Sequence, residues 1–131
     1  MKKVFIAFIL VLSFFSLVSC SDNDDEPRDK YYVEYNLRIN YLNRMNRGWD
    51  IVKKISYTTP EGQQSITTKN CSYSIKAGPF EKGELIRFTL SDTSAPATVT
   101  GTISVSINNG PFVEKEHYEG ERSFYMSYYI R

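Results

Sequence analysis

Few residues of this 131-residue chain have side chains suited to catalysis or metal binding: two cysteines, Cys20 and Cys71, and a single histidine, His117. A cysteine nucleophile needs a nearby base, and His117 is the one imidazole that could supply it. His117 lies among glutamates in residues 114–121, but one histidine with carboxylates on a hairpin specifies zinc poorly. A carboxylate pair for glycoside hydrolysis would need a cleft, which a small domain without long loops rarely builds. We therefore expect a protein that is not an enzyme, with no catalytic residue, metal or cofactor.

Cys20 ends an apolar stretch, Val4–Val18, that follows two lysines, Lys2 and Lys3. This apolar stretch is too short for a bilayer span, and no stop-transfer charges follow it. The pattern predicts an export signal over residues 1–19.

Leu17, Val18, Ser19 and Cys20 match the Leu-x-small-Cys lipobox, so the chain resembles bacterial lipoproteins. The resemblance implies that the signal is cut before Cys20 and that Cys20 is then acylated on its sulfur and its new amino group. Since each buried methylene contributes about 0.8 kcal/mol, two or three chains anchor a protein almost permanently. The alternative is an ordinary secretory signal in which Cys20 is a coincidence.

An acidic run follows Cys20 and consists of Ser21, Asp22, Asn23, Asp24, Asp25 and Glu26. It resembles the export signal of Bacteroidota-type surface lipoproteins, which implies an outer-membrane protein that faces the cell surface. Acidic blocks are also solvated tethers, which leaves a periplasm-facing position open. Its oxygens could suit calcium, but the export signal explains them better. The expected organisation is signal peptide 1–19, lipidated cysteine and tether 20–29, and one domain 30–131.

Composition limits the partners of the mature chain. Loss of the signal with its two lysines leaves 14 basic and 15 acidic side chains, and no basic cluster predicts nucleic-acid binding. With Cys20 acylated, Cys71 has no partner for an intrachain disulfide, and we expect it to be a small buried hydrophobe. Ten tyrosines with many Val, Ile and Thr residues favour β structure.

Alternation of apolar and polar residues predicts the strands. The expected strands are 33–40, 49–58, 63–69, 71–75, 84–91, 98–107, 112–118 and 122–130. Seven or eight strands at this spacing predict an all-β, antiparallel, immunoglobulin-like β-sandwich, without the Cys-Trp-Cys hallmark of antibody domains.

Turn residues separate these strands. Thr58–Gly62 predicts a type I turn with a G1 bulge, and Asn108-Asn109-Gly110 predicts a three-residue loop with Gly110 left-handed. Residues 77–83 and Glu119-Gly120 are expected to be connections. The polar strand 63–69 is expected at a sheet edge, where Lys and Gln discourage pairing with another sheet.

Two stretches, Ile55–Gly62 and Gly101–Asn108, are similar to the V-S-Y-T-x-x-x-G and I-x-V-x-G stretches of MmpS-type accessory proteins. The resemblance implies an immunoglobulin-like domain that serves a lipid transporter. Because the second cysteine and the Leu-Pro-Trp stretch of that family have no counterpart here, its function is not carried over.

Exposed aromatic residues are the candidates for binding. Tyr125 and Tyr129 alternate with the apolar residues of the last strand, and Trp49 begins the second. Exposed Tyr and Trp favour recognition surfaces. Tyr31 and Tyr32 would lie nearby if the first and last strands paired. We expect an interaction or structural module whose partner is an envelope protein or a host component. The alternatives are a glycan-binding module, a transport accessory, or tyrosines that merely cover the surface.

Overall fold

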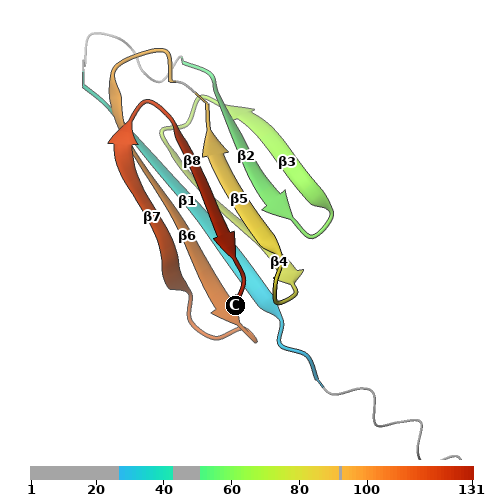
Figure 1. The fold of residues 1–131 in the computed structure, drawn as a ribbon. Coiled ribbons are helices and arrows are strands. Elements are labelled where there is room, and N and C mark those ends of the chain that lie inside the picture. Colours follow the sequence, from blue (N-terminus) through green and yellow to red (C-terminus); the bar gives the residue numbers. More distant parts are fainter. Residues whose placement is uncertain (1–26, 43–50, 92) are drawn as a thin grey trace, which may run out of the picture.

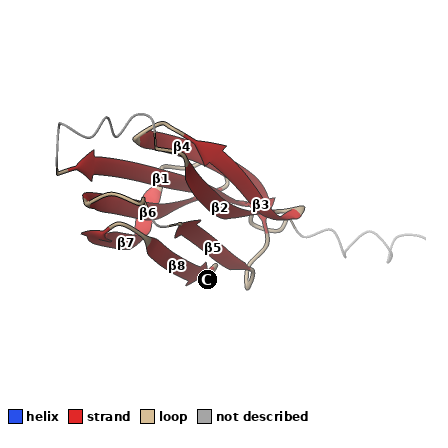
Figure 2. Cartoon of the chain, turned by 90° about the horizontal axis from the view of Figure 1, so that it is seen from above, coloured by secondary structure: helices blue, strands red, loops and turns tan. Residues whose placement is uncertain are grey.

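The computed structural model describes residues 27–42, 51–91 and 93–131. Eight strands form two antiparallel four-stranded sheets that face one another (Figures 1 and 2). The prediction of an all-β, antiparallel sandwich is confirmed. The predicted export signal, Cys20 and the acidic run through Glu26 lie outside the described residues, as does Trp49.

Each sheet combines strands that are distant in sequence. The first sheet has the order β4-β1-β6-β7, and the second has the order β3-β2-β5-β8. The strands of the first sheet are β4 (Ser72–Phe80), β1 (Tyr31–Tyr41), β6 (Ala97–Ile107) and β7 (Val113–Glu121). Those of the second are β3 (Gly62–Thr68), β2 (Lys53–Thr59), β5 (Leu85–Leu90) and β8 (Phe124–Tyr129). The polar strand β3 is at an edge, as predicted.

Part of the strand pairing resembles that of immunoglobulin sandwiches, in which strands A, B, E and D form one sheet and C, F and G the other. β1 beside β4 corresponds to B beside E, and β2 between β3 and β5 corresponds to C between C′ and F. β8 lies beside β5, where strand G would be. The difference is the β6–β7 hairpin, which precedes β8 and occupies the side of β1 that strand A would take.

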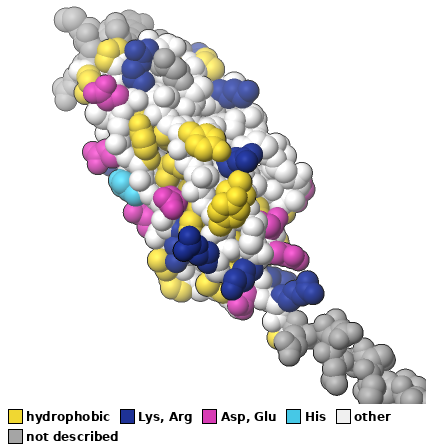
Figure 3. All heavy atoms as spheres, viewed as in Figure 1, with side chains coloured by type: hydrophobic (Ala, Val, Ile, Leu, Met, Phe, Trp, Pro, Cys, Tyr) yellow, Lys and Arg dark blue, Asp and Glu magenta, His cyan; other side chains and the backbone are white. Residues whose placement is uncertain are grey.

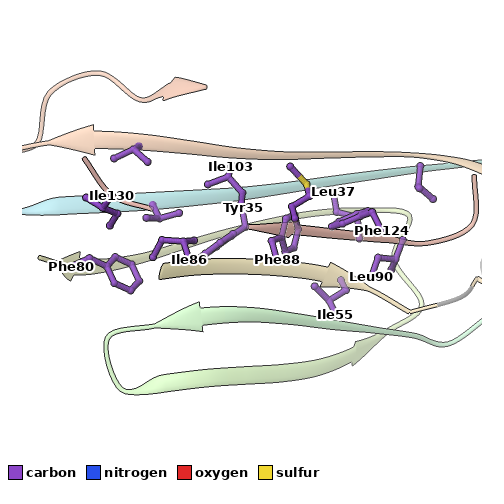
Figure 4. Close-up of a cluster of buried hydrophobic side chains, with 14 of the residues drawn as sticks. Tyr35, Leu37, Ile55, Phe80, Ile86, Phe88, Leu90, Ile103, Phe124 and Ile130 are labelled. Carbon is purple, nitrogen blue, oxygen red and sulfur yellow. The ribbon is translucent and has the colours of Figure 1, made fainter. Parts of the chain in front are cut away.

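The core lies between the two sheets and follows the period-two pattern of the strands. Tyr35 and Ile103 of the first sheet point toward Ile86 and Phe88 of the second (Figure 4). The hydroxyl of Tyr35 donates a hydrogen bond of 2.7 Å to the carbonyl of Thr58 in β2, which joins the layers. This bond gives the buried Tyr35 hydroxyl the polar partner that it needs there.

Gly101 of β6 lies on the core face of its strand. A Cβ atom at this position would meet Cζ of Phe124 at 2.8 Å and Sδ of Met126 at 3.0 Å. The glycine therefore makes room for two inward side chains of β8.

β4 continues through residues that were expected to form a connection. It runs to Phe80, whose side chain is buried in the core, and it includes a cis Gly78-Pro79 bond. The prediction of a connection over 77–83 is therefore wrong for residues 77–80, which belong to β4. Because β4 is an edge strand, Pro79 can lack a backbone donor without breaking a central ladder.

β7 also extends further than predicted, through Gly120 to Glu121. The Tyr118 ring lies over Gly120, so the small residue accommodates a neighbouring aromatic side chain and does not mark a turn. The chain turns at Arg122, which has a φ of 65° and whose N–H donates to the carbonyl of Ala97 at 3.1 Å.

The two asparagines form the β6–β7 turn. Asn108 and Asn109 have positive φ angles of 50° and 62°, and the N–H of Gly110 donates to the carbonyl of Ile107 at 2.9 Å. Two central residues with positive φ define a two-residue type I′ turn. The prediction of a left-handed Gly110 is therefore wrong, because asparagine tolerates this conformation too. At the β2–β3 turn the glycine, Gly62, does take a positive φ.

Candidate functional site

The outward side of β8 carries the two most exposed aromatic side chains of the described residues, Tyr125 (64% exposed) and Tyr129 (59% exposed). Phe124 and Met126 alternate with them and are buried against Gly101 of β6. Since side chains of a strand point to opposite faces in turn, one short strand supplies both core and surface. The predicted exposure of both tyrosines is confirmed.

The neighbouring strand β5 places a cation between the two tyrosines. In the antiparallel register, Tyr125 is opposite Thr89, Ser127 is opposite Arg87, and Tyr129 is opposite Leu85. Because Tyr125 and Tyr129 are four residues apart on one strand, their Cα atoms are separated by about 13 Å. We call Tyr125, Ser127, Tyr129, Arg87 and Thr89 the β5–β8 face. Figure 3 shows the hydrophobic side chains of one side of the molecule as separate patches, with Lys and Arg side chains next to several of them.

A hollow of about 530 Å³ adjoins this face at the open edge between the two sheets. β7 and β8 meet at the turn that follows Glu121 and separate from there (Figure 1). The residues that line the hollow are Lys115, Glu116, Ser127, Tyr128, Tyr129 and Arg131. Tyr129 thus borders both the flat face and the hollow, where it stands beside cations, a carboxylate and a hydroxyl. These groups can bind a polar partner.

The other aromatic candidates do not join this face. Trp49 lies outside the described residues. Tyr31 is 5% exposed and belongs to β1, which pairs with β4 and β6 in the first sheet. The supposition that the first and last strands pair is therefore wrong, because β1 and β8 lie in different sheets. Tyr32 packs beside Gly78 of β4.

The start of the domain is fixed to the β6–β7 turn. The Lys30 N–H donates to Oδ1 of Asn108 at 2.9 Å, and the Asn108 N–H donates to the carbonyl of Lys30 at 2.8 Å. Nδ2 of Asn108 donates to Oδ1 of Asp29 at 2.7 Å. These three hydrogen bonds join Asp29 and Lys30 to the β6–β7 turn.

One buried charged group was missed by the sequence analysis. Lys53 of β2 is only 1% exposed, and its Nζ donates to the carbonyl of Lys69 at 2.9 Å. The same Nζ is 4.0 Å from Sγ of Cys71 and 5.4 Å from the centroid of the Tyr41 ring. Burial lowers the pKa of Lys53, and the nearby Cys71 opposes this shift. Position 53 lies between Ile51 and Ile55 in the inward alternation, a signal that could have revealed it.

Tyr41 and Cys71 complete this corner. The Tyr41 hydroxyl is buried and has no hydrogen-bond partner, and burial raises the pKa of Tyr41, with a smaller contribution from Cys71. Cys71 was expected to be a buried hydrophobe. It packs against the core and is partly buried, so it is less enclosed than expected.

The remaining chemistry is sparse within the described residues. Nδ1 of His117 lies 3.4 Å from Oε1 of Glu114, and both side chains are exposed. In the described ranges, no three histidine, cysteine or acidic side chains gather as metal ligands would. The same ranges hold no helix long and apolar enough to cross a membrane.

The fold and these sites define a small antiparallel β-sandwich with an aromatic outer face. No protein-family model, curated protein or solved structure matches this chain.

Proposed function

We propose that this chain is a bacterial lipoprotein of the outer membrane, anchored through acylated Cys20 and facing the cell surface. The lipobox at Leu17–Cys20 and the acidic run that follows support this proposal. The nine residues from Ser21 to Asp29 span at most roughly 30 Å. Because Asn108 is hydrogen-bonded to Asp29 and Lys30, the tether joins the sandwich beside the β6–β7 turn.

The displayed domain is a non-enzymatic interaction module that binds an envelope protein or a host component through the β5–β8 face. The observation that carries this conclusion is the exposure of Tyr125 and Tyr129 on one face of an edge strand. Tyrosine provides a large contact area with a polar tip at low entropic cost, which is why recognition surfaces favour it.

Membrane fractionation tests the anchor. A Cys20→Ala variant should keep the β-sheet circular dichroism spectrum of the wild type but leave the membranes in a carbonate wash. A Ser21→Ala variant is the matched control and should stay in the membrane fraction. If Cys20→Ala still sediments with membranes after the wash, the chain is not a lipoprotein.

Glycan binding is the second candidate, and the spacing of the tyrosines favours it. Two exposed tyrosines whose Cα atoms are about 13 Å apart along one strand, with Ser127 between them and Arg87 opposite Ser127, could stack on separated sugars of one oligosaccharide and bind its hydroxyls. On a glycan array the wild type should bind defined oligosaccharides that Tyr129→Ala does not bind. An array without signal, or equal binding by both proteins, excludes this candidate.

A further inference from the structure

The corner formed by Lys53, Cys71 and Tyr41 places an amine beside a thiol across the two sheets. Lys53 begins β2 in the second sheet, whereas Cys71 immediately precedes β4 in the first. The 4.0 Å separation of Nζ and Sγ is close enough that a small side-chain movement would bring the two atoms into bonding contact.

Backbone hydrogen bonds hold both partners in place. The Lys69 carbonyl accepts from Nζ of Lys53 at 2.9 Å, and the N–H of Ile39 donates to the carbonyl of Cys71 at 2.7 Å. The Lys69 carbonyl therefore holds the amine near Cys71, and the backbone of Cys71 is itself bonded to β1. Such prepositioning favours reaction between two groups over reaction with solvent.

The surroundings also favour the neutral amine, which is the nucleophilic form. In the described ranges no carboxylate forms an ion pair with Lys53, and burial lowers its pKa. Cys71 is less enclosed than Lys53, because the cysteine is only partly buried whereas the lysine is 1% exposed. An oxidant as small as hydrogen peroxide should therefore react at Cys71, and Nζ of Lys53 is already within 4.0 Å of its sulfur.

We propose that Lys53 and Cys71 form a covalent nitrogen–sulfur crosslink between the sheets when hydrogen peroxide oxidises Cys71. In the first step the sulfur takes one oxygen from peroxide, which gives a sulfenic acid and one water. In the second step the Nζ lone pair attacks the sulfur, the N–S bond forms, and the S–O bond breaks. The departing hydroxide takes the amine proton and leaves as a second water. Sulfur loses two electrons and peroxide gains two.

The crosslink would stabilise this domain in the way that a disulfide stabilises other domains. Since Cys71 has no disulfide partner in the lipidated chain, unprotected oxidation would continue to the irreversible sulfinic acid. Capture by Lys53 stops oxidation at a stage that thiols can reverse. It also closes the chain between positions 53 and 71, which restricts the unfolded state and should raise Tm by about 10 °C.

Peptide mass spectrometry of the mature, lipidated protein in detergent tests the proposal. After treatment with a few equivalents of hydrogen peroxide, the digest should contain the Lys53 and Cys71 peptides joined, with a mass about 2 Da below their sum. Dithiothreitol should separate them and return Tm to its starting value. Because the joined peptides are read in the wild type, this result does not depend on the folding of any variant.

Two variants complete the design. Lys53→Met keeps a long apolar side chain but removes the amine, so its Cys71 peptide should gain about 16 or 32 Da as sulfenic or sulfinic acid. Cys71→Ser should show no peroxide-dependent change in Tm. If the wild-type Cys71 peptide stays a free thiol, or becomes sulfinic acid at the same rate as in Lys53→Met, the crosslink does not exist.

Discussion

Two places in this sandwich depart from the rule that strands point apolar side chains inward and polar ones outward. On β8, Tyr125 and Tyr129 are large and exposed, whereas on β2 the charged Lys53 is buried. The inward residues of β8, Phe124 and Met126, are buried and hold the strand in place without help from the two tyrosines. Lys53 is surrounded by groups of both sheets. We infer that Tyr125 and Tyr129 are available for binding. Lys53, in contrast, contributes to the folded structure and to the proposed crosslink.

Phe124→Ala should give the largest effect and set the scale for an inward position of β8. The ring is buried against Gly101 and lies 5.0 Å, centroid to centroid, from Phe88. Loss of a buried phenylalanine costs about 3–5 kcal/mol, which urea unfolding can measure. The adjacent Tyr125→Ala is the matched control on the same strand. Equal losses for the two variants would contradict the division of β8 into a core side and a free side.

Lys53→Met should change stability in a pH-dependent way. Burial lowers the folded-state pKa of Lys53 below its unfolded value of about 10.4. The free energy of unfolding is therefore highest above pH 10.4, where the amine is neutral in both the folded and the unfolded state. That stability falls as pH drops through the folded-state pKa. The methionine avoids this penalty and should stabilise the reduced protein by about 1 kcal/mol at neutral pH. Unfolding curves from pH 6 to 10.5 should converge at the alkaline end, and a constant difference would show that the buried charge has no such cost.

Tyr35→Phe should cost about 1 kcal/mol near pH 7, because it removes the hydrogen bond to Thr58 that joins the sheets. Burial raises the pKa of Tyr35, so its neutral hydroxyl contributes stability that is present below about pH 10 and lost as pH rises further. The wild type should therefore lose stability more steeply than Tyr35→Phe between pH 10 and 11.5. Parallel pH profiles from thermal unfolding would exclude Tyr35 as the titrating group.

The smallest effect on folding should come from the outer side of β8. A Tyr125→Ser, Tyr129→Ser double variant should keep its free energy of unfolding within about 0.5 kcal/mol of the wild type. Both rings are more than half exposed, so their removal gives up little buried contact. A loss above 2 kcal/mol in urea unfolding would mean that the tyrosines belong to the core after all.

Much of the fold follows from local patterns, because burial of one face imposes a period of two. That period predicted β1, β5, β6 and β8 and the exposure of Tyr125 and Tyr129. The ends of β4 and β7 were missed because Pro79 and Gly120 are typical turn residues. An edge position and the ring of Tyr118 make them acceptable in strands.

The pairing of β1 with β6 and of β5 with β8 joins segments that are far apart in the chain, and no local pattern encodes it. The same reason explains the Lys53 corner. Its position in the alternation could have been read from the sequence, but its neighbours Lys69 and Cys71 are supplied by the fold.

Photocrosslinking on native cells tests most directly whether the β5–β8 face is the binding surface. A benzoylphenylalanine at position 125, 129 or 67 of the full-length chain would react with whatever lies against it. Thr67 is the control, because it is exposed on β3, at the opposite edge of the same sheet. Our account predicts one shared adduct from positions 125 and 129 and none from position 67. Adducts of equal yield from all three positions, or adducts from position 67 alone, would contradict it.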